Sequence, residues 1–202
     1  EQPPPDSIDL EELIRSETAE RGGLVTQIMN AGGSPAGREF AARNADYLFR
    51  GITTAEAGRQ DIAGVHADAK ALGRELEVFT NAYVVCRPTV KEAEEYHHYY
   101  AVEHADEGAV DRMFTGRGIK DDPNLTDAVK AARKRRIAAG NSAYPIIGDP
   151  DSVVAQMQEL SDMGLSGIAM GLVNYVDHFP YFRDQVLPRL ARAGLRKEVK
   201  NG

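Results

Sequence analysis

A chain of 202 residues is long enough for one domain with a sizeable hydrophobic core. Its 24 basic and 31 acidic residues give a net charge of -7, which disfavours nucleic acid and anionic membrane surfaces as partners. The single cysteine, Cys86, cannot form a disulfide within the chain, and no apolar run approaches the ~20 residues of a membrane span. We therefore expect a cytoplasmic protein in which Cys86 is a buried strand residue.

The first half of the chain predicts helices that alternate with short strands. Gly22 and Gly23 end the first helix, and Thr53 or Thr54 caps the third. Apolar runs bounded by glycine and polar residues indicate strands. We expect helices over 8–21, 35–44 and 53–72, and strands over 24–30, which is expected to be buried, 45–49 and 77–86.

The second half begins with a charged helical stretch from residue 89 to about residue 139, with breaks near 115–118 and 122–123. This stretch is long for a connection between a strand and a helix, so we interpret 89–143 as an insertion. Its basic run, 133–136, is expected to be a solvated helix face or a local anion contact. The remaining elements are a loop over 140–145, a helix over 150–163, a strand over 167–172 and a helix over 181–193.

Four short strands alternating with helices are typical of an α/β fold with a parallel sheet. A complete (β/α)8 TIM barrel takes about 250 residues. We therefore predict a partial (β/α)8 barrel of about four units, formed by residues 24–202, with a short N-terminal segment over 1–23. Such a half-barrel leaves two open sheet edges and an uncovered apolar face, so it must pair with another copy, a complementing half or its own first helix.

The glycine-rich turn over 30–38 is the strongest functional motif. Free N–H groups at the helix start favour an anion, and Gly33 has no Cβ to obstruct its approach. Ser34 adds a hydroxyl, and Arg38 is a candidate for a positive charge. A nucleotide P-loop needs Lys followed by Ser or Thr, whereas this chain has Arg38 and Glu39. Spacing alone favours a phosphate site and a turn without ligand equally.

Three segments resemble the bacterial-luciferase-like superfamily. The first reads NAGGSPAGREFAARNADYLF from residue 30, the second reads YPIIGDP from residue 144, and the third spans 163–190. The resemblance is strongest to reduced-flavin monooxygenases that oxidise alkanesulfonates, dimethyl sulfone, aminopolycarboxylates, pyrimidines and long alkanes. It covers about residues 28–195 and implies the C-terminal half of a barrel, since family members are nearly twice as long.

The resemblance implies that Gly33 and Ser34 bind the phosphate of FMN, with Asn30 and Ala31 beside them. Reduced FMN from a partner flavin reductase would then react with O2 to oxygenate a small organic substrate. A deazaflavin (F420) also presents a phosphate and stays an alternative cofactor. A second hypothesis is a non-catalytic half-barrel that acts only through flavin binding or assembly. The catalytic residues of this oxidoreductase family are not identified in the chain.

Other polar clusters allow several interpretations. Glu94, His97 and His104 share a helix face, where a lid or dimer contact is favoured over a zinc site. Tyr144 either lies near the flavin and substrate or packs in the interior. His178 follows the last strand and is a candidate acid or base, although a capping or surface role is favoured. No metal site is predicted.

Overall fold

The computed structural model describes residues 26–197, so the predicted helix over 8–21 and the segment over 1–23 lie outside the described residues. In this part of the chain, the strands are β1 (Met29–Asn30), β2 (Tyr47–Phe49), β3 (Glu77–Cys86), β4 (Tyr144–Gly148) and β5 (Gly167–Gly171). The helices are α2 (Pro35–Asn44), α3 (Ala55–Ala71), α4 (Val90–His98), the π-helix η1 (Tyr99–Glu103), α5 (Glu107–Gly116), α6 (Asp127–Gly140), α7 (Pro150–Asp162), α8 (Tyr175–Gln185) and α9 (Leu187–Arg192). None of these helices is both long enough and apolar enough to cross a lipid bilayer.

The long strand β3 organises the sheet, and every strand pair is parallel, as predicted. Phe79 pairs with Phe49 of β2 and with Gly167 of β5, so β2 and β5 lie on opposite edges of β3. β4 pairs with residues 82–86 of β3, and β5 pairs with residues 79–83 of β3. At Ala82 and Tyr83 the two strands therefore lie on opposite edges of β3. β4 therefore continues the β2 edge, and β1, β2, β3 and β5 form a ladder in sequence order.

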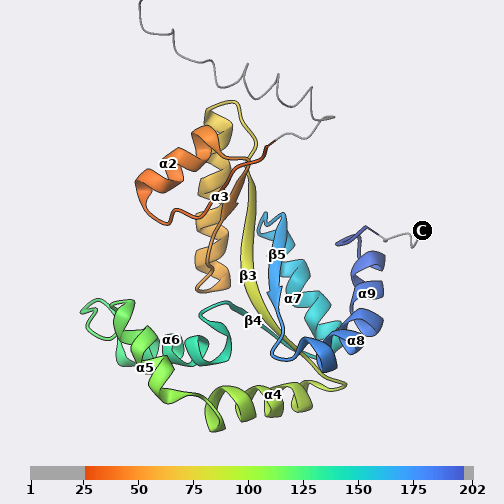
Figure 1. Ribbon diagram of the computed structural model, residues 1–202. Coiled ribbons are helices and arrows are strands. Elements are labelled where there is room, and N and C mark those ends of the chain that lie inside the picture. Colours follow the sequence, from red (N-terminus) through yellow and green to blue (C-terminus); the bar gives the residue numbers. More distant parts are fainter. Residues whose placement is uncertain (1–25, 198–202) are drawn as a thin grey trace, which may run out of the picture.

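Figure 1 shows how the helices surround β3. α2 and α3 lie to its left, α7, α8 and α9 to its right, and α4, α5 and α6 below its carboxyl end. One face of β3, carrying Val78, Ala82 and Val84, packs into the main core with residues of α3 and α7. The opposite face carries Phe79, Asn81 and Tyr83. This second face belongs to the inside of the partial barrel.

β1 corrects the prediction of a buried strand over 24–30. Only Met29–Asn30 are in a strand, and the side chains of Ile28 and Met29 are 44% and 53% exposed. The reason is the position of β1 at the edge of the sheet, where β2 is its one neighbour among the described strands. The apolar pattern of this edge strand is the same as that of a strand buried in a complete sheet, so the sequence alone does not distinguish the two.

β4 was missed by the sequence analysis, which placed Tyr144 and Pro145 in a loop and predicted four strands. Tyr144 is instead the first residue of β4. Proline lacks an N–H and is tolerated in a strand that pairs on one side. β4 has β3 as its single neighbour among the described strands, which explains how Pro145 fits.

The helical stretch after β3 is confirmed, with one further break at 104–106, where Asp106 caps α5. The last helix starts earlier than predicted, at Tyr175, because the side chain of Asn174 accepts hydrogen bonds from two N–H groups of its first turn. It also ends early, and α9 begins separately at Leu187, next to Pro188. Proline cannot continue the hydrogen-bond ladder of a helix, so the predicted single helix is divided.

Candidate functional site

The turn between β1 and α2 is held by a close backbone approach. A Cβ atom on Gly32 would lie 2.8 Å from the Cα atom of Gly37, so neither glycine accepts a side chain. The side-chain oxygen of Asn30 accepts a hydrogen bond of 2.7 Å from the N–H of Gly32. Gly33 differs, because no described residue other than its two chain neighbours has an atom within 4 Å of its Cβ position. Packing thus requires Gly32 and Gly37, whereas Gly33 borders open space.

Ser34 is the N-cap of α2, and its Oγ accepts a hydrogen bond of 3.1 Å from the N–H of Gly37. Pro35 occupies the first turn and contributes no N–H. The N–H groups of Gly33, Ser34 and Ala36 have no acceptor within residues 26–197. Three exposed donors at the positive end of a helix dipole form an arrangement suited to an anion.

Arg38 does not supply the free positive charge that the sequence suggested. Its Nε donates to Asp68 of α3 at 2.6 Å, and its Nη1 lies 3.7 Å from Asp61. Arg50, which sequence reasoning missed, lies nearer the turn, with Nη1 3.5 Å from the carbonyl oxygen of Gly33. Arg50 is itself paired with Asp61 at 2.6 Å. Two arginines and two aspartates therefore neutralise one another along a cleft of about 570 Å³ between α2 and α3.

A second cavity, of about 360 Å³, lies on the inner face of β3, between β5 and the end of α6. Asn81 and Tyr83 line it, and the sequence analysis singled out neither. The hydroxyl of Tyr83 lies 3.2 Å from Nε2 of His97. Burial raises the pKa of Tyr83 to about 12, and burial together with the neighbouring His98 lowers the pKa of His97. Both groups are therefore neutral near pH 7.

His178 lies at the carboxyl edge of the sheet but is engaged by Arg87. Nη2 of Arg87 lies 2.9 Å from Nε2 of His178, and the Arg87 guanidinium stacks 4.0 Å from the centre of the Tyr96 ring. Burial and the adjacent Arg87 lower the pKa of His178. An imidazole Nε2 that accepts from a guanidinium is not available as a base, so the favoured structural role fits the geometry.

His97 and His104 of the predicted lid or dimer helix contact different side chains. His97 contacts Tyr83 and Tyr100, whereas the ring of His104 lies 4.2 Å from that of Tyr99. Within residues 26–197, no three His, Cys, Asp or Glu side chains come together as metal ligands.

Arg136 corrects the interpretation of the basic run as solvated. It is partly buried, and its guanidinium donates to carbonyl oxygens in two loops. These are Ile52 and Thr53 after β2, and Ser142 and Ala143 before β4. Its carbon Cζ lies 5.9 Å from the centre of the Tyr144 ring, and Tyr144 packs against the main core. Lys134 does make the expected local anion contact, at 3.0 Å from Glu107 and 2.8 Å from Asp111.

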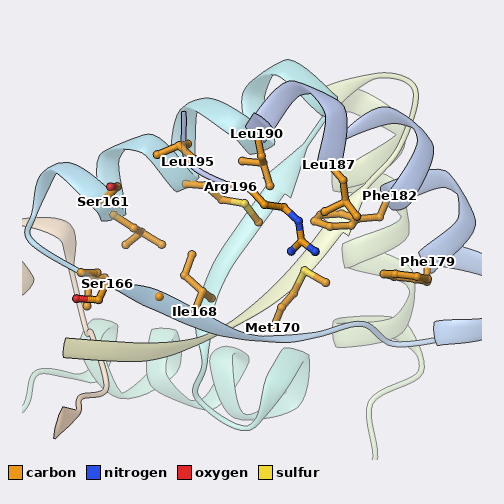
Figure 2. A pocket seen from close by; sticks show the side chains of 14 residues that line it. Ser161, Ser166, Ile168, Met170, Phe179, Phe182, Leu187, Leu190, Leu195 and Arg196 are labelled. Carbon is orange, nitrogen blue, oxygen red and sulfur yellow. The ribbon is translucent and has the colours of Figure 1, made fainter. Parts of the chain in front are cut away.

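An apolar groove of about 320 Å³ runs beside β5. Figure 2 shows Ile168 and Met170 of β5 on one side, with Phe182 and Leu190 opposite and the guanidinium of Arg196 between them. β5 pairs with β3 alone among the described strands, so its other edge is open beside this groove. The lining of the groove is mostly apolar, its polar side chains are those of Ser161, Ser166 and Arg196, and it includes no Asp, Glu, His, Cys or Lys.

Comparisons with known proteins agree with this fold. A curated relative, the FMNH(2)-dependent dimethylsulfone monooxygenase of Pseudomonas fluorescens (strain Pf0-1), is 25% identical over 168 residues, which cover 80% of this chain and 45% of the relative. The chain thus spans about half the length of the curated relatives it matches. The crystal structure of DmoA from Hyphomicrobium sulfonivorans matches 88% of this chain and 44% of its own, with 22% identity and a TM-score of 0.71. That of the long-chain alkane monooxygenase LadA matches the same shares, with 25% identity and a TM-score of 0.67.

The family comparison covers most of the sequence. Residues 6–167 match the model of the luciferase-like monooxygenase family. This match and the shared fold confirm the resemblance and the α/β fold class predicted from the phosphate turn and the strand order. The chain therefore belongs to the luciferase-like monooxygenase family.

Proposed function

We propose that the chain is the C-terminal part of a flavin-dependent monooxygenase and that the turn over 30–38 holds the phosphate of FMN. The observation that carries the proposal is the start of α2, where three N–H groups without an acceptor in the described chain surround the uncovered Gly33. Membership of the family and the FMNH(2) dependence of the curated relatives support FMN as the occupant. F420 stays the alternative, because it presents a phosphate as well.

The residues of the turn fit a phosphate group. The N–H groups of Gly33, Ser34 and Ala36 would donate to its oxygens, and the hydroxyl of Ser34 would add a fourth donor while its oxygen still caps the helix. Asn30 fixes the turn through Gly32, and Ala31 lies between them. Reduced flavin supplies the electrons with which O2 oxygenates a small organic substrate, and a partner reductase would supply the reduced flavin.

We also propose that residues 24–202 form a partial barrel whose helices at 89–143 cover its carboxyl edge. Arg136 supports this, since it ties α6 to the loop after β2. The open edges of β1 and β5 and the groove in Figure 2 favour completion by an N-terminal half or by another copy. The single cysteine is consistent with a cytoplasmic location.

One experiment separates this proposal from the hypothesis of a non-catalytic half-barrel, which the short span relative to the curated relatives favours. The full chain is titrated with oxidised and reduced FMN and with F420, and oxygen uptake is then measured with a flavin reductase present. FMN binding with substrate-dependent uptake supports the enzyme. FMN binding without uptake supports the non-catalytic alternative, and no binding at high flavin concentration overturns the phosphate site.

A further inference from the structure

The cavity on the inner face of β3 lacks charged walls. Its lining residues include no Asp, Glu, Lys, Arg or His, and only Asn81 and Tyr83 among them carry polar side chains. Its other walls are backbone and apolar side chains of α6, β5 and the residues that follow them, namely Ala139, Gly140, Ala143, Ala169, Met170, Gly171, Leu172 and Val173, together with Ala82 of β3. A volume of about 360 Å³ lies at the small end of the range for ligand pockets.

Asn81 lines this cavity, and its side chain is a carboxamide with two N–H groups and one carbonyl oxygen. No described residue makes a hydrogen bond with its side chain, so both its N–H groups and its oxygen stay available. Tyr83, two residues further along the same face of β3, has its hydroxyl next to His97. Gly140 allows the end of α6 to approach the Tyr83 ring, because a Cβ there would overlap that ring. The cavity is therefore shaped by Tyr83 and can form directional hydrogen bonds through Asn81.

The electrostatics of the surroundings disfavour a charged ligand. The hydroxyl of Tyr83 keeps its proton at neutral pH, and His97 is neutral there as well. The guanidinium near the cavity, that of Arg136, already donates to four carbonyl oxygens, including that of Ala143. An anion that entered the cavity would lose part of its hydration without gaining a paired cation, which is unfavourable.

We infer that this cavity binds the substrate of the proposed monooxygenase and selects a small neutral polar molecule whose oxygen accepts a hydrogen bond from the Asn81 carboxamide. Sulfones, sulfoxides, amides and ketones have this chemistry, and Ala169 and Val173 would contact their alkyl groups. Sulfonates and carboxylates of the same size are excluded by their charge. The inference rests on the proposed function and adds the substrate class and the residue that recognises it.

A matched pair of probes tests the inference. Methanesulfonate has a charged oxygen where dimethyl sulfone has its second methyl group, so the two molecules are nearly equal in size. Dissociation constants are measured by ligand-observed NMR on the full chain with FMN present. We expect dimethyl sulfone to bind at least ten-fold tighter than methanesulfonate. Asn81→Leu, similar in shape but without hydrogen-bonding groups, should weaken sulfone binding at least ten-fold. The exposed Asn124 gives the control Asn124→Leu, which should leave both constants unchanged.

Flavin fluorescence, read in the same samples, distinguishes failure of the inference from failure of the proposed function. Three outcomes overturn the inference alone, provided that FMN binds. Methanesulfonate binds as tightly as dimethyl sulfone or tighter, neither probe binds, or Asn81→Leu leaves sulfone binding unchanged. Sulfone selectivity without FMN binding overturns the proposed function alone. Circular dichroism checks the fold of each variant. If Asn81→Leu does not fold, Asn81→Asp, which keeps the shape but replaces the donor by a negative charge, should likewise weaken sulfone binding ten-fold.

Discussion

The guanidinium of Arg136 donates a hydrogen bond of 2.7 Å to the carbonyl oxygen of Ile52, and so joins helix α6 to the loop that follows β2. A second bond of 2.7 Å reaches Thr53, and further bonds reach the carbonyl oxygens of Ser142 and Ala143, just before β4. One side chain thus ties α6 and the residues just before β4 to a loop more than 80 residues earlier in the sequence. It holds α6 to the loop after β2, at the carboxyl edge of the sheet, where the turn over 30–38 also lies.

Removing this side chain should destabilise the fold. Arg136→Ala leaves four carbonyl oxygens without this donor, three of them in partly buried hydrogen bonds, at an expected cost of about 2–4 kcal/mol in the free energy of unfolding. Arg136→Lys should recover only part of this, because an ammonium lacks the planar fork. Urea unfolding measures both. The exposed neighbour gives the control Arg135→Ala, expected to change stability by less than about 0.5 kcal/mol. Equal effects at the two positions would contradict the role of Arg136.

The contrast between Arg136 and Thr54 shows what sequence alone could predict. The N-cap of α3 and the start of α2 at Pro35 depend on chemistry within one helical turn; Pro35 was predicted correctly, and the cap was predicted as Thr53 or Thr54, of which the structure has Thr54. Two partners of Arg136, Ile52 and Thr53, lie more than 80 residues away, so its run of four basic residues reads like any solvated helix face. β4 was missed for a similar reason, because only its pairing with β3 makes Pro145 acceptable in a strand.

The candidate site was predicted only in part for the same physical reason. Asn30, Gly33 and Ser34 lie within five residues of one another in sequence, so their turn could be inferred, although their role in binding a flavin stays a prediction. Arg38 was assigned to the turn from helix spacing, but Asp68 of the next helix determines where its charge lies. Asn81 carries no local motif, and only the alternation of β3 places it beside a cavity.

Substitutions of the glycines in the turn over 30–38 should distinguish a role in packing from a role in FMN binding. Gly32→Ala puts a methyl group 2.8 Å from the Cα atom of Gly37, and we expect it to destabilise the chain by about 1–3 kcal/mol. Gly33→Ala meets open space and should leave stability within about 0.5 kcal/mol while weakening FMN binding. Thermal unfolding and flavin titration measure the two effects. Gly51→Ala, which also meets open space, should change neither. A Gly33→Ala variant with unchanged FMN affinity would exclude close approach of the phosphate there.

Ser34 should contribute to both stability and flavin binding. Ser34→Ala removes the cap of α2, at about 1 kcal/mol of unfolding free energy, and should weaken FMN binding by about 1–3 kcal/mol. Ser34→Asp separates the two roles, because aspartate caps a helix well but repels a phosphate. We expect it to unfold like the parent chain and to lose FMN binding. Thr54→Ala, which removes the cap of α3, should lower stability alone. Unchanged FMN affinity in Ser34→Asp would contradict the phosphate site.

The buried thiol of Cys86 should make stability depend on pH in mildly alkaline solution. Burial raises its pKa to about 11, from the ordinary value of 9.0. The protonated thiol therefore favours the folded state, so its contribution is complete below about pH 9 and is lost as pH rises toward about 11. Between pH 9 and 10 the free energy of unfolding should fall by about 1 kcal/mol. Urea unfolding between pH 9 and 10 tests this expectation, because the raised pKa of Tyr83 lowers the free energy of unfolding mainly above pH 10. Cys86→Ala should show a flatter dependence, and an equal slope would assign the effect to other groups.

The Arg87 guanidinium has a carbonyl, an imidazole and an aromatic ring as partners, but no carboxylate within 4.0 Å among the described residues. His178→Glu would place a carboxylate beside it, near the N-terminal turn of α8, where negative charge is also favoured. The neighbouring Asp177 opposes this with like charge, so we expect a net gain of about 1 kcal/mol, seen as a higher melting temperature at pH 7. His178→Gln keeps a similar size without charge and should gain nothing. The gain should disappear near pH 3, where the new carboxylate is protonated, and a gain that persists there would show that packing, not the ion pair, is responsible.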